Sequence, residues 1–103
     1  LNLLLERINA IEGVPEDRIY DSCSEIRSKI RNFLQRNGMT KVALTRALGN
    51  INHKSLNKFL SAEHQQQSGY VTYKNAYIFF EKLRILQEES KSSARLRNED
   101  ELP

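Results

Sequence analysis

Apolar side chains recur at helical spacing along much of this 103-residue chain. The clearest stripe consists of Ile26, Ile30, Phe33 and Leu34, which follow one another at i, i+4, i+7 and i+8 and therefore share one helix face. The pattern predicts an all-α protein, a small bundle of about five helices with a central helix-turn-helix. The expected helices cover about residues 1–12, 22–37, 40–48, 52–61 and 73–90.

Capping residues predict where these helices begin and end. Ser22 and Glu25 have the spacing of a capping box, in which each side chain accepts a hydrogen bond from the other residue's backbone N–H. Thr40 is expected to cap the start of the next helix, because its hydroxyl can accept a hydrogen bond from a backbone N–H of the first turn. That helix is expected to end at Gly49, because glycine adopts the left-handed conformation of helix ends at little cost. Thr72 is expected to cap the last long helix.

Three segments are expected to differ in organisation. Residues 1–14 form an amphipathic helix, stopped before Pro15, whose leucine-rich face packs on the domain or on a second copy of itself. Residues 20–90 form the helical domain, and residues 91–103 form a mobile charged tail. The polar stretch 61–69 is expected to be either a wing along a phosphate backbone or a solvated connection. Because the chain starts without Met, we expect it to be a fragment of a longer protein.

The stretch from residue 39 to residue 60 combines the features of a helix-turn-helix unit. Leu44 and Leu48 lie on one face of its first helix, and Gly49 permits the turn. Asn52 can cap the second helix, which commonly enters the DNA major groove in such units. Two short amphipathic helices joined through glycine also occur in many all-α domains. The pair is therefore either a DNA-binding unit or only part of the helical scaffold. The apolar face of the second helix consists of Leu56, Phe59 and Leu60.

Basic residues are concentrated in the same part of the chain. The formal net charge is only +3, but residues 27–58 contain no acid, whereas the acids gather towards both ends. Such a stretch forms either a solvated face without a ligand or a basic surface that attracts nucleic acid. Its basic residues are Arg27, Lys29, Arg31, Arg36, Lys41, Arg46, Lys54 and Lys58.

These observations predict a DNA-binding face, in a transcription or chromatin-associated factor. Lys can donate to guanine and Asn can bind adenine in the major groove, while His53 could instead serve local capping. Arg27 and Arg31 are predicted as further phosphate contacts. The predicted nucleic-acid-binding residues are Lys41, Arg46, Asn52, His53, Lys54, Ser55, Asn57 and Lys58.

The alternative function is a protein-interaction or oligomerisation module of a nuclear assembly. The helix at 73–90 is apolar nearly all round, so it is either the central helix of the domain or in contact with a partner. In this interpretation the first helix binds a protein partner or a second copy, as a homodimer. The predicted interface residues are Leu4, Leu5, Ile8, Ile11, Ile78 and Phe79.

Other functional classes find no support in the sequence. The single cysteine, Cys23, cannot form an internal disulfide, which suits a reducing, intracellular location such as the nucleus. It is either a small packing residue or a thiol whose pKa the helix dipole lowers. No nucleophile–base pair, Gly-rich phosphate loop or zinc-ligand spacing is present. We therefore expect no enzyme activity, metal, cofactor or small-molecule substrate, and no membrane span.

One motif consists of Thr40-x-x-x-Leu44-x-x-x-Leu48-Gly49, followed by Asn52 and Leu56. It resembles the helix-turn-helix of the λ-repressor/Cro-like superfamily. The resemblance implies an all-α bundle whose recognition helix is 52–61. This chain departs from the superfamily pattern in two ways. Thr45 stands where Ala is usual, and the turn is one residue longer, which leaves the angle between the two helices open.

Two motifs flank this unit in the sequence. The first is Tyr20-Asp21-Ser22-Cys23-x-Glu25-Ile26-Arg27-x-Lys29-Ile30-x-x-Phe33-Leu34, and the second is Tyr73-x-x-Ala76-x-x-Phe79-Phe80-x-Lys82. They resemble the opening and the end of a domain of unknown function found in fungal proteins, over about residues 20–85. The resemblance implies a helical fold and is compatible with DNA binding.

Overall fold

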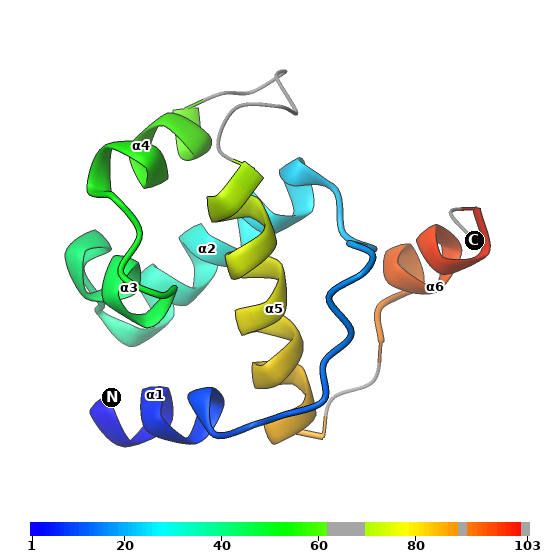
Figure 1. Ribbon diagram of the computed structural model, residues 1–103, viewed down its shortest axis with the longest axis horizontal. Helices are drawn as coiled ribbons and strands as arrows, with labels where there is room; N and C mark the ends of the chain where they lie inside the picture. The colour runs from blue at the N-terminus through cyan, green and yellow to red at the C-terminus, as the bar shows by residue number, and fades with distance from the viewer. Residues whose placement is uncertain (62–69, 89–90, 102–103) are drawn as a thin grey trace.

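The computed structural model describes residues 1–61, 70–88 and 91–101. These described residues form helices joined by turns and loops, with no strand, so the all-α prediction is confirmed, with six helices instead of about five (Figure 1). The helices are α1 (Asn2–Asn9), α2 (Cys23–Asn37), α3 (Lys41–Ala47), α4 (His53–Ser61), α5 (Tyr70–Leu86) and α6 (Ser93–Glu101).

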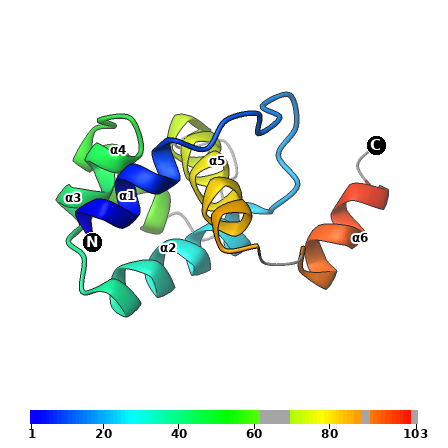
Figure 2. The same ribbon diagram turned by 90° about the horizontal axis from the view of Figure 1, so that it is seen from below.

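The central helix is α5, which packs against α1, α2 and α4 (Figures 1 and 2). Its apolar residues fall on more than one face, and Tyr77 and Phe80 are both buried. The ring of Phe33 on α2 meets Phe79 and Phe80 edge-on, with centroid separations of 5.4 and 5.8 Å. Of the two arrangements predicted for this helix, the central one is therefore confirmed.

The predicted caps of α2 and α3 are present. The Ser22 hydroxyl accepts the N–H of Glu25 at 3.1 Å, and the Glu25 carboxylate accepts the N–H of Ser22 at the same distance. The Thr40 hydroxyl accepts the N–H of Ala43 at 3.1 Å. Gly38 ends α2 with φ +59°, a left-handed conformation that glycine adopts without the strain of a side chain. These local signals place α2 and α3 close to their predicted positions.

Three predicted boundaries are corrected. The first helix ends at Asn9 instead of continuing to residue 12. The last long helix begins at Tyr70 and ends at Leu86, so Thr72 lies inside its first turn instead of capping it. Thr72 is 1% exposed, because α5 turns this face towards the core. The predicted wing or solvated connection lies outside the described residues apart from Ser61, which ends α4.

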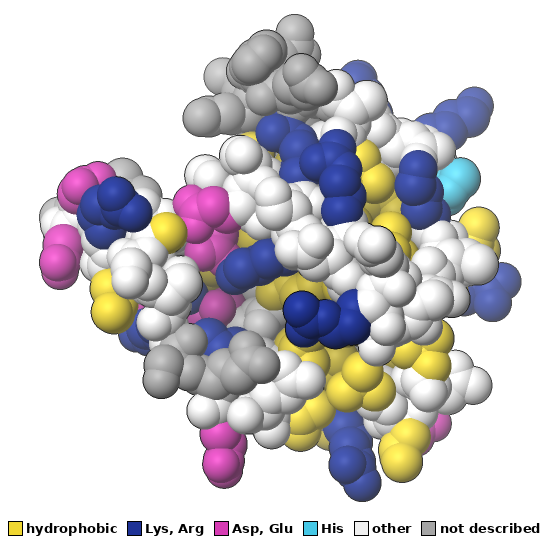
Figure 3. Space-filling view, turned by 180° about the vertical axis from the view of Figure 1, so that it is seen from behind, with side chains coloured by type: hydrophobic (Ala, Val, Ile, Leu, Met, Phe, Trp, Pro, Cys, Tyr) yellow, Lys and Arg dark blue, Asp and Glu magenta, His cyan; other side chains and the backbone are white. Residues whose placement is uncertain are grey.

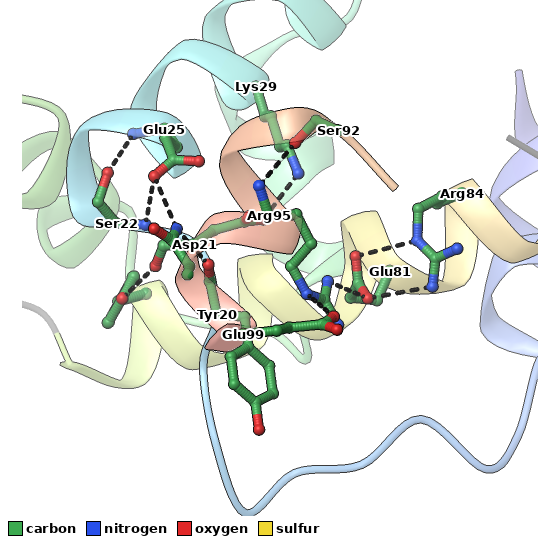
Figure 4. Close-up of polar contacts among 12 residues, drawn as sticks. Tyr20, Asp21, Ser22, Glu25, Lys29, Glu81, Arg84, Ser92, Arg95 and Glu99 are labelled. Carbon is green, nitrogen blue, oxygen red and sulfur yellow. Dashed lines mark hydrogen bonds and ion pairs between the residues drawn. The ribbon is translucent and has the colours of Figure 1, made fainter. Parts of the chain in front are cut away.

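The C-terminal segment forms α6 instead of the predicted mobile charged tail. The Arg95 guanidinium pairs with the Glu81 carboxylate of α5 (Figure 4). It also lies over the rings of Tyr20 and Tyr77, at 5.1 and 5.5 Å from their centroids. The Asn98 amide donates to the Tyr20 carbonyl at 2.6 Å. Charge composition alone could not predict these contacts, because the partners of α6 lie on distant parts of the chain.

The core includes two of the six predicted interface residues, which corrects that prediction. Ile8 of α1 is 0% exposed and Phe79 of α5 is 3% exposed, so neither can anchor a partner. They are buried because α1 packs directly on α5. The other predicted interface residues are partly buried, and they are Leu4, Leu5, Ile11 and Ile78.

Candidate nucleic-acid interface

Two consecutive left-handed residues form the turn between α3 and α4. Gly49 has φ +87° and Asn50 has φ +58°. Asparagine tolerates this conformation better than most residues, so Gly49 and Asn50 form the turn with little strain. The side-chain amide of Asn75 on α5 donates to the Leu48 carbonyl at 2.9 Å, which ties the turn to the central helix. This bond and the packing of α4 on α5 hold the α3–α4 pair against the central helix.

Thr45 also fits this local structure. It is 6% exposed, and its hydroxyl donates to the Val42 carbonyl at 2.5 Å, so its polar group is satisfied within α3. The Thr45 carbonyl in turn accepts the N–H of Ile51 at 3.1 Å. The Thr45 backbone thus stabilises the turn, and the Thr45 hydroxyl already has a hydrogen-bond partner within α3.

One face of α4 packs in the core and the opposite face meets solvent. Leu56 and Phe59 are 0% exposed. The Asn52 side chain accepts the N–H of Lys54 at 2.7 Å and so caps the helix, as predicted. Of the eight predicted nucleic-acid-binding residues, only Ser55 is half-buried and the rest are exposed. The core contacts therefore direct the predicted donors of α4 outward.

A shallow groove of about 670 Å³ runs along the border of α2, α3 and α4. Arg31, Lys41 and Lys58 line it, and its described lining contains no acid. Lys41 Nζ donates to Asn57 Oδ1 at 3.1 Å, which links the start of α3 to the outer face of α4. Figure 3 shows Lys and Arg side chains across this side of the molecule, whereas most acidic side chains lie towards α6 or the lower edge.

Arg27 is part of the core, which corrects its prediction as a phosphate contact. It is 5% exposed, and its Nε donates to the Phe59 carbonyl at 2.7 Å. Its guanidinium lies 4.9 Å from the centroid of the Phe59 ring. The side chain thus binds the C-terminal end of α4, where helix carbonyls lack partners and a positive charge is favoured.

Arg31 has a related structural contact. Its Nη2 donates to the Leu60 carbonyl at 2.6 Å, one residue further along α4. Arg27 and Arg31 lie four residues apart on α2 and together hold the end of α4. A sequence signal existed for Arg27, because it lies three residues before Ile30 and so borders the apolar stripe.

The environment of Cys23 agrees with a packing role. The thiol belongs to the buried core and is 5% exposed. Burial raises its pKa above the usual value, although the nearby Arg27 charge opposes the shift. The lowered pKa considered from its position near the helix start is therefore corrected.

Residues 17–90 match the model of a family described as a domain of unknown function, DUF7726. The chain belongs to the DUF7726 family. The match begins before α2 and extends beyond the end of α5, so it contains the whole α3–α4 pair, whereas α1 and α6 lie outside it. No match was found among curated proteins or solved structures. Membership of a domain family of unknown function is thus confirmed, while the fungal source and the Cro-like motif stay predictions.

Neither a metal-binding cluster nor a membrane-spanning helix occurs among the described residues of this DUF7726 chain. Within residues 1–61, 70–88 and 91–101, no group of three or more His, Cys, Asp or Glu side chains is placed to hold a metal ion. In the same part of the chain, no helix has the length and apolar character needed to cross a bilayer.

Proposed function

We propose that this DUF7726 domain binds double-stranded DNA, with α4 in the major groove, as part of a nuclear transcription or chromatin-associated factor. The observation that carries the proposal is the outer face of α4, which is exposed, rich in hydrogen-bond donors and free of acidic residues. An α-helix fits the major groove, where each base pair presents its own pattern of donors and acceptors.

The base-reading side chains would be Lys54 and Asn57, with His53 at the start of the helix. Lys54 and Asn57 are three residues apart and therefore neighbours on the helix surface. Because Asn57 Oδ1 already accepts a hydrogen bond from Lys41, its amide is left to donate to acceptors such as guanine O6 or thymine O4. The adenine contact expected for an unengaged asparagine would require Lys41 to move.

Phosphates would contact the basic residues that surround this face. Lys58 follows Lys54 by one helical turn, while Lys41 and Arg46 lie on the neighbouring α3. All four are exposed. Arg27 is not included, since its guanidinium is buried at the end of α4, and Arg31 contributes at most the charge that it adds to the shallow groove.

Salt dependence provides the direct test. If the three phosphate-contacting residues (Lys41, Arg46 and Lys58) each neutralise one phosphate, log K should fall with log salt at a slope of about −2.7. The affinity for a labelled duplex should then drop roughly 40-fold between about 50 and 200 mM KCl, measured by fluorescence anisotropy. A flat salt response, or no binding at the lower salt concentration, would reject the proposal.

A second candidate function, association through α1, has one specific observation in its favour. Leu3 is 60% exposed and Leu1 is 52% exposed, and Figure 3 shows hydrophobic side chains along the lower edge on the side of α1. Contiguous exposed apolar side chains mark contact surfaces between proteins, whereas single exposed ones are normal. The buried Ile8 cannot take part, so the surface differs from the predicted one.

Leu3→Glu should abolish any self-association and leave the free energy of unfolding within about 0.5 kcal/mol of the original, because the side chain is exposed. Sedimentation velocity measures the first effect and urea denaturation the second. Leu96→Glu is the matched control, because Leu96 is 50% exposed on the distant α6. A chain that is monomeric before substitution at micromolar concentration would count against a homodimer.

A further inference from the structure

A groove of about 270 Å³ lies between α2, α5 and the start of α6. Phe33 and Phe80 are among its lining residues, and Glu81 is the one acid among those described. The basic lining residues come from three separate parts of the chain, and they are Lys29, Arg36, Arg84, Lys91 and Arg95. The fold thus gathers positive charge around a hollow that lies apart from the α4 face.

Carboxylates pair with most of these cations. Glu81 pairs with Arg84 and Arg95, Asp21 pairs with Lys29, and Glu99 pairs with Lys91 and Arg95. Arg36 is exposed and forms an ion pair with no carboxylate of the described residues. A phosphate monoester carries a charge of about −1.5 to −2 at neutral pH and would be attracted to such a cluster of cations.

Ser92 places a hydroxyl on the wall of the same groove. The residue is exposed, precedes α6 directly and accepts the N–H of Arg95 at 3.0 Å (Figure 4). Figure 4 draws it on the side of α6 that faces Lys29. Ammonium and guanidinium groups form short, charge-assisted hydrogen bonds with phosphate oxygens, so the lining cations could bind a phosphate attached at this position.

We propose that Ser92 is a phosphorylation site and that the groove between α2, α5 and α6 binds its phosphate. A protein kinase would transfer the γ-phosphoryl group of a nucleoside triphosphate to Ser92 Oγ. The new Oγ–P bond forms as the bond from the γ-phosphorus to the bridging oxygen breaks. The hydroxyl proton passes to a base of the kinase, and the nucleoside diphosphate leaves.

The bound phosphate would fasten α6 to the domain. In the unmodified chain α6 is held by polar contacts, because Arg95 is the one buried residue among those described in this helix. Leu96, its one leucine within the helix, is 50% exposed. Phosphate contacts to Lys29 and Arg36 would add to the side-chain bond that already links α6 to α2, from the Asn98 amide to Glu25 Oε1 at 3.2 Å.

Ser93 separates this groove effect from a general helix effect. It is the first residue of α6 and is exposed, yet it does not line the groove. A phosphate on either serine meets the same helix N-terminus, where negative charge is favoured. Only a phosphate on Ser92 would also contact the groove cations. The difference in phosphate pKa between the two positions therefore measures the effect of those cations.

The test uses the full chain with phosphoserine incorporated at position 92 or, as the control, at position 93. Titration followed by phosphorus NMR gives the second pKa of each phosphate. We expect the pKa at position 92 to lie at least about 0.5 unit below that at position 93, because the cations favour the dianion. Arg36→Gln should remove much of this difference without unfolding the chain, since Arg36 is exposed.

Equal pKa values at the two positions would overturn the proposal, as would a difference that Arg36→Gln leaves unchanged. Saturable binding of inorganic phosphate by the unmodified chain at millimolar concentration, with no pKa difference between the phosphoserines, would assign the groove to a free anion instead. None of these measurements uses DNA, so the result is independent of the proposed DNA binding.

Discussion

Replacing Lys54 and Lys58 with glutamate should lower the affinity for duplex DNA by roughly 100-fold or more, if α4 enters the major groove. Both side chains are exposed on the outer face of α4, so the substitutions should leave the core intact. Each replaces a cation that can donate to a base or a phosphate with an anion that the phosphates repel. The loss is therefore larger than that of two hydrogen bonds.

Net charge is the main confounding effect, and a matched variant controls for it. Arg7→Glu with Arg97→Glu changes the net charge by the same amount, at exposed positions on α1 and α6. Anisotropy titrations of both double variants at one salt concentration make the comparison, and thermal unfolding checks that both are folded. An equal loss of affinity in the two variants would show a general charge effect and contradict the assignment to α4.

Phe59→Ala should lower the free energy of unfolding by about 3–5 kcal/mol. The Phe59 ring is 0% exposed, lies 6.1 Å from the Tyr73 ring in a stacked arrangement, and carries the Arg27 guanidinium above it. Removing the ring leaves a cavity and takes away the surface on which Arg27 packs. Since small domains are stable by only about 5–15 kcal/mol, the loss is a large share of the total. Urea denaturation followed by circular dichroism measures it.

Two companion variants define the scale of this effect. Phe59→Leu keeps much of the buried volume and should cost less than about 1.5 kcal/mol. Val42→Ala alters a side chain that is 48% exposed and should change stability by no more than about 0.5 kcal/mol. If Phe59→Ala were no more destabilising than Val42→Ala, Phe59 would not hold α4 against the domain. DNA binding would then have to be explained without a fixed orientation of α4.

Features that depend on near neighbours could be predicted from the chain alone. The capping box of Ser22 and Glu25 and the cap at Thr40 involve groups three residues apart, and both are present. The turn at Gly49 has the left-handed backbone that its glycine indicated. Helical periodicity likewise predicted the buried side of α4, including Leu56 and Phe59. In each case the partners lie within about one or two helical turns along the chain.

Features that depend on distant partners emerged only when the helices were packed together. Arg27 was predicted to contact phosphate because its charge is visible in the sequence, whereas the Phe59 carbonyl that binds it lies 32 residues away. Ile8 resembled the other leucines and isoleucines of its helix, and only the packing of α1 on α5 buries it. The charged segment 93–101 forms α6, whose Arg95 pairs with Glu81 on α5.

The candidate DNA-binding face also has one feature that the sequence predicts and one that only the tertiary structure decides. The alternation of apolar and donor residues along the sequence assigns two faces to α4. The packing of Phe59 beneath Arg27 and the bond from Asn75 to the Leu48 carbonyl decide where the outer face points. Periodicity specifies the faces of a helix, because it depends on residues one turn apart. Its orientation in the domain depends on contacts between residues far apart in the sequence, which only the tertiary structure supplies.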